Sequence, residues 1–277
     1  MIRPRELSRD LALFPAKTPT LPPATHTNSY ALGTQEILLV EPATPYEDEQ
    51  REWIAWARAL ESQGRKLKAI VLTHHHEDHV GGLDVLSREL GVPVWAHDIT
   101  ADLVGREKIA RTLSDGETIS LEGGHEWLVL HTPGHDRGHI CLHNTHIRAL
   151  VIGDMAASVG TILIAPGDGD MQIYLEQLGR LAKQYASLAL PAHGEPIDDP
   201  AALFRKYIAH RLMRENKVFH AIEKTPGSTD AELVPLAYDD APTHLYPIAL
   251  LSLRAHLEKL AREGRVALRD DKWSIGL

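Results

Sequence analysis

The sequence predicts a mixed α/β (α+β) protein in which helices cover β-sheets, with a smaller domain at the C-terminal end. Over the first two thirds of the 277 residues, short apolar runs typical of strands alternate with helical patterns. The last third holds helical patterns followed by a single hairpin pattern. A chain of this length can bury one large core and one small one.

The predicted strands are short runs rich in apolar and β-branched residues. Each run is followed by polar, turn or loop residues. The five clearest runs are 36–41 (EILLVE), 68–73 (KAIVLT), 92–97 (VPVWAH), 125–132 (HEWLVLHT) and 149–154 (ALVIGD).

The predicted helices lie between and after these strands. In residues 50–63 (QREWIAWARALESQ), Trp53, Ala57 and Leu60 recur at helical spacing, so one face packs and the other carries charge. Residues 82–90 and 171–186 show the same periodicity. Strands and helices therefore alternate, which favours sheets covered by helices.

The C-terminal third is dominated by helices. A long helix is predicted from about Pro200 to the breaker TPGS, and a second follows the Ser/Thr/Asp cap of STDAELVPLAY. A third helix ends at Gly264, and a short hairpin turns at Asp270 and Asp271. Three helices and a hairpin indicate a winged-helix-like module. We therefore expect a catalytic domain at 1–200 and this module at 201–277.

Composition excludes several classes of protein. A formal net charge of -9 with an isoelectric point near 6.0 provides no overall attraction to nucleic acid or to an anionic membrane. The single cysteine, Cys141, excludes an internal disulfide framework and a cysteine-based zinc site. No apolar run has the length of a signal peptide or a membrane span. We expect a cytoplasmic protein that does not associate with membranes.

The most informative stretch is THHHEDHVGG at residues 73–82, which places four histidines and two carboxylates directly after a predicted strand. Its pattern is His-x-His-x-Asp-His, from His74 to His79. Residues two apart in a loop that leaves a strand can project together, and the next residues can turn towards a neighbouring point. This geometry suits two adjacent metal ions.

Two metal ions need more ligands than this stretch supplies, because a catalytic zinc takes about three protein groups and keeps one position open. Three further candidates follow predicted strands or lie in glycine-containing loops: His135, Asp154 and His193. The predicted assignment is His74, His76 and His135 on the first ion, Asp78, His79 and His193 on the second, and Asp154 as the bridge. Zinc (Zn2+) suits this set best, although iron or manganese accepts the same ligands.

Such a pair of ions lowers the pKa of bound water, so that a hydroxide becomes available as the nucleophile near neutral pH. The positive charges also stabilise the negative oxygen that develops when the hydroxide attacks a carbonyl or phosphoryl centre. Asp78 is placed to accept or pass on the proton. The predicted chemistry is hydrolysis without a side-chain nucleophile.

For other polar residues near these motifs, a direct role in the reaction is less strongly indicated. His139 is a candidate substrate contact, although we favour a structural role for it next to the site. Tyr174, one turn into the helix from Met171, is a second candidate substrate contact, although a packed tyrosine is the more common case. Asp168 and Asp170 lack the ligand number of a calcium loop, and we expect them to cap that helix.

The motifs together resemble the metallo-β-lactamase superfamily. THHHEDH, TPGH, the GD pair and AHG occur in the order of that superfamily, over roughly residues 28–195. The resemblance implies an αββα sandwich with a dinuclear zinc site at one edge. The chain looks most like the β-lactamase-like protein 2 group, in THTNSYALG, in ILIAPGDGDMQIYLEQLGRL and in YIAHRLMRENKVFHAI. That group includes an endoribonuclease that acts on single-stranded RNA.

Departures from sister families narrow the choice. Antibiotic-hydrolysing members often use a cysteine ligand or lack the aspartate of the fourth motif position, whereas Asp78 is present and Cys141 lies outside every motif. Glyoxalase II resembles the metal motifs, but its C-terminal region differs from the helices and hairpin expected here. The insertions of ribonuclease Z are absent from the sequence.

The leading hypothesis is a two-zinc hydrolase with a small-molecule acyl substrate such as an ester, thioester, lactone or lactam. The alternative is a metal-dependent endoribonuclease acting on single-stranded RNA. Residues 210–217 (HRLMRENK) would supply three basic side chains for it, but such a run is more often a solvated helix face. A DNA-binding role is disfavoured by Asp270 and Asp271 in the hairpin turn. A homodimer is compatible with an exposed apolar helix in the C-terminal third.

Overall fold

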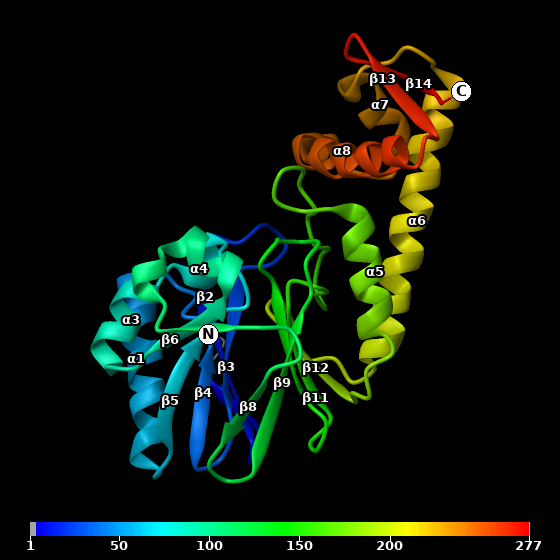
Figure 1. The fold of residues 1–277 in the computed structure, drawn as a ribbon. Helices are drawn as coiled ribbons and strands as arrows, with labels where there is room; N and C mark the ends of the chain where they lie inside the picture. The colour runs from blue at the N-terminus through cyan, green and yellow to red at the C-terminus, as the bar shows by residue number, and fades with distance from the viewer. Residues whose placement is uncertain (1–3, 277) are drawn as a thin grey trace. The chain divides into compact units, whose positions relative to one another are not determined.

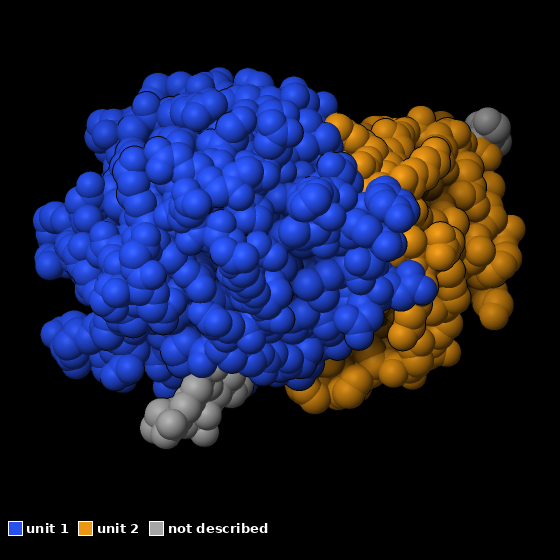
Figure 2. All heavy atoms as spheres, turned by 90° about the horizontal axis from the view of Figure 1, so that it is seen from below, with its two compact units in different colours: residues 1–132, 137–161, 185–200 blue, residues 133–136, 162–184, 201–277 orange. Residues whose placement is uncertain are grey.

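The computed structural model describes residues 4–276, which form two compact units (Figure 2). The first unit comprises the chain up to Thr132 together with Arg137–Thr161 and Tyr185–Pro200. The second comprises Pro133–Asp136, Ile162–Gln184 and the chain from Ala201 onward. The tetrapeptide Pro133–Asp136 therefore packs with the C-terminal part of the chain. No helix in the described residues is both long enough and apolar enough to cross a membrane.

The first unit contains two sheets (Figure 1). The seven-stranded sheet runs in chain order, antiparallel from β1 to β4 and parallel from β4 to β7. Its strands are β1 (Arg5–Ser8), β2 (Leu11–Lys17), β3 (His26–Leu32), β4 (Glu36–Val40), β5 (Lys66–Val71), β6 (Val94–His97) and β7 (Arg111–Leu113).

The five-stranded sheet has the order β12-β11-β10-β9-β8, and only the pair β11 and β12 is parallel. Its strands are β8 (Thr118–Leu121), β9 (His125–His131), β10 (Ile140–Asn144), β11 (Ala149–Gly153) and β12 (Leu188–Pro191). The five strands predicted from the sequence are all present, with ends that differ by a few residues.

Alternation of side chains along the strands divides the apolar residues of the first unit into two cores. In β4, Leu38 and Val40 face the five-stranded sheet and join a core that includes Trp127 from β9. Ile37 and Leu39 face the opposite way and join the core under the helices. A strand buried on both faces needs apolar residues at every position, which explains the continuous run ILLV.

The helices of the first unit include α1 (Glu47–Ser62) and α3 (Leu83–Leu90), which cover the outer face of the seven-stranded sheet (Figure 1). Trp53 of α1 and Leu86 of α3 are fully buried there. The predicted amphipathic face of α1 is thus confirmed. Short helices α2 (Glu77–Val80) and α4 (Asp98–Val104) and the 3₁₀ turn η1 (Arg106–Lys108) follow strands of the same sheet.

The second unit contains helices and one hairpin, as the sequence predicts. The helices are α5 (Met171–Leu181), α6 (Pro200–Lys224), α7 (Asp230–Ala237) and α8 (Tyr246–Arg262), with a 3₁₀ turn η2 (Thr243–Leu245), and the hairpin is β13 (Val266–Arg269) with β14 (Lys272–Ile275). Asp270 and Asp271 both have positive φ, 49° and 58°, as a two-residue type I′ turn requires. Thr229 and Glu232 form the capping box of α7.

The basic run on α6 differs from its prediction. Arg211 and Arg214 are buried, with 4% and 6% of their surface exposed, so the expected solvated face is wrong for these two residues. Arg214 donates to the Ala237 carbonyl and pairs with Asp240 at 2.8 Å. Glu215 is also buried and accepts from Lys259 of α8 at 3.0 Å. Helical spacing reports which residues share a face, but it cannot reveal that carbonyls and carboxylates of neighbouring helices line that face.

We expect Leu86→Ala to lower the free energy of unfolding by about 2 to 5 kcal/mol, because it leaves a cavity where α3 packs on the sheet. Leu103→Ala is the matched control. Leu103 also lies on a helix of the first unit but is 41% exposed, so the loss should stay within about 0.5 kcal/mol. Urea unfolding followed by tryptophan fluorescence measures both. Equal losses for the two variants would contradict the packing described for α3.

Candidate metal centre

Most of the predicted ligands follow strands that end at one edge of the two sheets. His74 comes three residues after the end of β5, and Asp154 directly follows β11. His193 follows β12, which pairs in parallel with β11, with Gly153 opposite Pro191. Because neighbouring parallel strands point the same way, the loops that carry Asp154 and His193 begin side by side.

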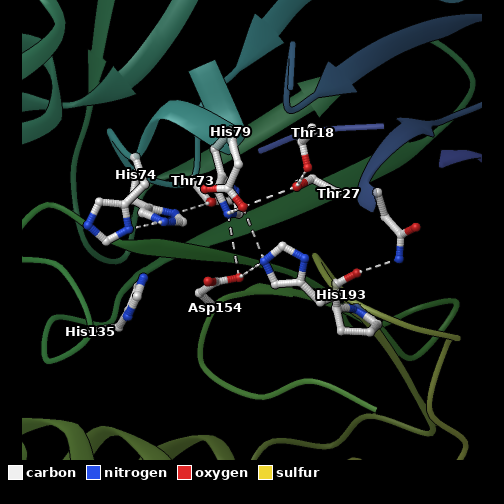
Figure 3. A network of polar contacts seen from close by, with 12 residues as sticks. Thr18, Thr27, Thr73, His74, His79, His135, Asp154 and His193 are labelled. Carbon is white, nitrogen blue, oxygen red and sulfur yellow. Dashed lines mark hydrogen bonds and ion pairs between the residues drawn. The ribbon is translucent and has the colours of Figure 1, made fainter. Parts of the chain in front are cut away.

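Four of the predicted ligands converge in the first unit, and Figure 3 shows Asp154 and His193 directed towards His79. Nε2 of His79 lies 3.7 Å from Oδ2 of Asp78 and 3.6 Å from Oδ1 of Asp154. Nε2 of His193 lies 3.5 Å and 3.4 Å from the same two oxygens. Each imidazole nitrogen therefore faces both carboxylates.

The other two histidines of the motif lie beside this group. Nε2 of His74 is 3.0 Å from Nδ1 of His76, and the ring centroids of His74 and His79 are 4.0 Å apart. Nδ1 of His74 is 2.9 Å from the hydroxyl of Thr73. With Nδ1 held by its neighbour, Nε2 of His74 is the nitrogen directed towards His76.

The residues fit a divalent cation. His79 is fully buried, and neither of its ring nitrogens has a hydrogen bond within the described part of the chain. Its Nε2 instead faces carboxylate oxygens of Asp78 and Asp154 at 3.7 and 3.6 Å, which is too long for a hydrogen bond but suits atoms that share one ion. A buried polar side chain without partners is rare in folded proteins unless an ion or water completes it. Imidazole and carboxylate are the donors that zinc prefers when cysteine is absent.

The carboxylates dominate the electrostatics of the metal-free site. Burial lowers the pKa of His79, but Asp78, Asp154 and Glu41 outweigh this effect and raise the pKa to about 10. Burial likewise opposes a charge on His193, yet Asp154 raises the pKa of that imidazole. Burial raises the pKa of Asp78, whereas His79 and His193 lower it below its usual range. The carboxylates of the site thus favour positive charge next to them.

Glu41 is a residue of this site that the sequence analysis did not identify. It directly follows β4, is 1% exposed and adopts a positive φ of 63°. One carboxylate oxygen accepts from the Thr73 amide at 3.2 Å, and the other lies 3.5 Å from Nδ1 of His79. A glutamate at the end of an apolar strand was the available signal, and its position beside the histidine motif became visible only in the fold.

Asn28 and Tyr30 of β3 were also missed as site residues. The Asn28 amide donates to the carbonyls of Pro191 and Gly194 at 2.9 and 2.7 Å, and the Tyr30 hydroxyl donates to the Pro191 carbonyl at 2.7 Å. His193 itself lies 3.0 Å through Nδ1 from the His26 carbonyl. These bonds hold the loop 191–194 and direct Nε2 of His193 towards the carboxylates. The signal in the sequence was that Asn28 and Tyr30, two residues apart, place polar groups on one face of a buried strand.

The two candidate substrate contacts are both buried. His139 has no exposed surface; its Nδ1 lies 2.9 Å from the Thr132 hydroxyl, and its Nε2 accepts from the Asp154 amide at 3.1 Å. This arrangement favours the structural role, because the ring holds the backbone of a predicted ligand. Tyr174 of α5 is also without exposed surface, which favours packing over substrate contact.

His135 belongs to the tetrapeptide that packs in the second unit. Its Nδ1 lies 2.8 Å from the Leu163 carbonyl, and this contact orients the imidazole ring. The grouping of His135 with His74 and His76 stays a prediction from the sequence. Asp170 caps α5 by accepting from the amides of Gln172 and Ile173, so the expected helix cap is confirmed.

A separate pocket of about 310 Å³ contains none of the predicted ligands. It lies at the opposite ends of β8, β9 and β10 from the histidine cluster, where His125 begins β9 and Asn144 ends β10. This pocket is therefore not part of the predicted metal centre, which is identified by its side-chain chemistry.

Comparison with known proteins agrees with this fold. Residues 22–193 match the model of the metallo-beta-lactamase superfamily, and residues 229–273 match the beta-lactamase associated winged helix domain. The beta-lactamase-like protein 2 homolog of Caenorhabditis elegans is 29% identical, over 87% of this chain and 80% of its own length. The atrochrysone carboxyl ACP thioesterase AacuM of Aspergillus aculeatus is 28% identical, over 88% of this chain and 78% of its own length.

Two solved structures have the same fold. A beta-lactamase domain protein from Burkholderia ambifaria matches with a TM-score of 0.87 at 21% identity and covers 99% of this chain and 93% of its own. A metallo-beta-lactamase family protein from Thermus thermophilus matches with a TM-score of 0.78 at 24% identity, over 97% and 99% of the two chains.

The chain belongs to the metallo-β-lactamase superfamily and carries a C-terminal winged-helix domain. It is a metal-dependent hydrolase. The predicted αββα sandwich with a winged-helix-like domain is thereby confirmed, as is the resemblance to the β-lactamase-like protein 2 group.

We expect Glu41→Gln to weaken zinc binding about 10- to 100-fold, because the variant removes the carboxylate charge that faces His79. Glu36→Gln is the control: Glu36 is also a buried, paired carboxylate of the same strand, but it lies at the opposite end of β4. Competition with a chromophoric chelator measures both affinities. Equal affinities in Glu41→Gln and the unmodified protein would exclude this role for Glu41.

Proposed function

We propose that the protein is a dinuclear zinc hydrolase that cleaves acyl substrates, with thioesters as the foremost class. The observation that carries the proposal is the convergence of Asp78, His79, Asp154 and His193 around one point, with nitrogen to oxygen distances of 3.4 to 3.7 Å. The relative from Aspergillus aculeatus, which matches most of the chain, is named as a thioesterase acting on an acyl carrier protein substrate. A second relative, from Emericella nidulans, is named thioesterase pkgB.

The proposed ligands follow the sequence prediction: His74, His76 and His135 for one ion, Asp78, His79 and His193 for the other, and Asp154 between them. Support for Asp154 as a bridge comes from its Oδ1, which faces the Nε2 atoms of both His79 and His193. Ions bound there would supply a hydroxide nucleophile near neutral pH and would stabilise the oxyanion formed at the acyl carbon.

The chain's own contribution is orientation and proton handling. The Thr27 hydroxyl donates to Oδ2 of Asp78 at 3.3 Å, which fixes the direction of the carboxylate. Because its pKa is lowered, Asp78 is ionised at neutral pH and can accept a proton during the reaction. Once hydroxide had added to the acyl carbon, the carbon–sulfur bond would break. The departing thiolate would receive the proton of that hydroxide by way of Asp78, which gives a carboxylate and a thiol.

The endoribonuclease alternative loses one of its supports. Two of the three basic residues that it would use, Arg211 and Arg214, are buried and bound to groups of the second unit. An arginine that is hydrogen-bonded inside the protein is not available to neutralise a phosphate. RNA cleavage therefore remains the second candidate and is tested beside the first.

We expect zinc-loaded protein to hydrolyse members of a panel of acyl thioesters and esters and to leave labelled single-stranded RNA intact. Chelation should abolish the hydrolysis, and added zinc should restore it. Release of free thiol measures the first activity, and gel electrophoresis measures the second. RNA cleavage that is lost on chelation, together with an inert acyl panel, would replace the proposal with its alternative.

Asp78→Asn should lower kcat/KM for the best substrate by at least about 100-fold, because the amide neither binds a cation well nor accepts a proton. Asp84→Asn is the control. Asp84 lies on the next helix, and its exposed carboxylate pairs with Lys108, away from the predicted ligands. Steady-state kinetics at saturating zinc compare the two. If Asp78→Asn retained full activity, the role of Asp78 would be wrong.

A further inference from the structure

The segment that carries His135 is built into the C-terminal unit by backbone contacts. Gly134 accepts from the Asp170 amide at 2.8 Å. Gly134 also has a φ of 133°, and a Cβ there would collide with the backbone of Tyr174 in α5. Only a glycine allows this approach, so residues 133–136 pack directly against the start of α5.

The imidazole of His135 is oriented by the same unit. Its Nδ1 donates to the Leu163 carbonyl at 2.8 Å, and this bond fixes the plane of the ring. Leu163 lies in the segment 162–170, which leads into α5. The position of His135 therefore depends on where the segment 162–170 is held.

Arginines from two C-terminal helices hold this segment at its two ends. Nη2 of Arg211, on α6, donates to the Ile162 carbonyl, and its guanidinium lies 5.7 Å from the ring centroid of Tyr174. Arg262, on α8, binds both carboxylate oxygens of Asp170 at 2.6 and 2.9 Å. Asp170 in turn caps α5 and donates its amide to Gly134.

We propose that Arg211 and Arg262 are positioning residues for His135, so that helices of the second unit orient one of the predicted metal ligands. The path runs from α6 and α8 through the segment 162–170 to the Leu163 carbonyl and the imidazole. This inference rests on the proposed function only in that it takes His135 to be a metal ligand. It assigns a task to the motif YIAHRLMRE that the hydrolytic chemistry itself leaves unexplained.

The ion pair between Arg262 and Asp170 should orient the segment 162–170 more than it stabilises the fold. Its side chains are 46% and 27% exposed, and exposed ion pairs contribute little to stability because water screens them. A bidentate pair nevertheless fixes direction as well as distance. Loss of the pair should therefore show in the affinity of one metal ion before it shows in the stability of the fold.

The test compares Arg262→Gln with Arg254→Gln. Arg254 is on the same helix and pairs with Asp230 at 2.6 Å. The exposed fractions of these two side chains, 48% and 24%, are similar to those of Arg262 and Asp170. Asp230 lies outside the segment 162–170, so this pair does not hold that segment. Asp170→Asn is a second variant, because asparagine keeps the helix cap while it weakens the pair with Arg262. His135→Ala is the reference for complete loss of the ligand.

Stepwise titration of the metal-free full-length protein with zinc, in competition with a chelating dye, gives the affinity of each site. We expect Arg262→Gln and Asp170→Asn to weaken one of the two sites by about tenfold, the same site that His135→Ala removes, and to leave the other site unchanged. Arg254→Gln should bind both ions normally. Arg262→Lys should be intermediate, because lysine keeps the charge but not the bidentate geometry.

A readout without activity comes from cobalt substitution and hydrogen exchange. The absorption bands of Co(II) at the weakened site should shift in Arg262→Gln, and the amides of residues 134–136 should exchange faster. In Arg254→Gln both the bands and the exchange rates should stay unchanged. If His135→Ala loses a site but both Arg262→Gln and Asp170→Asn bind both ions within twofold of normal, the positioning role is wrong. If His135→Ala itself keeps both sites, the proposed ligand set fails instead.

Discussion

The buried imidazole of His79, surrounded by the carboxylates of Glu41, Asp78 and Asp154, is the constraint around which the first unit is organised. Carboxylates removed from water repel one another, and a single imidazolium cannot balance them. Burying such a group is costly unless cations complete it. The two sheets make the arrangement feasible, because several strands end at the same edge and deliver these side chains from three different segments.

Support for this cluster comes from residues that do not carry its chemistry. Glu41 accepts a backbone amide from the histidine motif while it faces His79, and it does so from a left-handed backbone conformation that non-glycine residues adopt only when their surroundings require it. Asn28 and Tyr30 hold the loop of His193 in the same way. One antiparallel strand, β3, thus connects the centre of the sheet to a ligand-bearing loop of the other sheet.

The second unit uses buried charge differently. Arg211, Arg214 and Glu215 follow one another closely on α6, and each is matched by a carbonyl, a carboxylate or an ammonium group of the same unit. Such pairs contribute less to stability than an apolar core of the same volume, but they specify which surfaces of the helices meet. The winged-helix domain is therefore attached to α6 by directional contacts, and the same helix reaches the segment that orients His135.

Much of this could be read from the order of the residues. Periodicity located the strands and the amphipathic face of α1, and glycine or aspartate at the helix and hairpin ends marked the turns correctly, since these features depend on neighbours in the chain. The histidine motif and the three later candidate ligands could be predicted because metal coordination demands a particular number and type of donor atoms. Glu41, Asn28 and Tyr30 were not predicted as site residues. Arg211 and Arg214 of α6 were expected on a solvated helix face but are buried. Their roles depend on partners between 23 and 166 positions away, such as Ala237 for Arg214 and Gly194 for Asn28, and only the folded chain brings those partners within hydrogen-bonding distance.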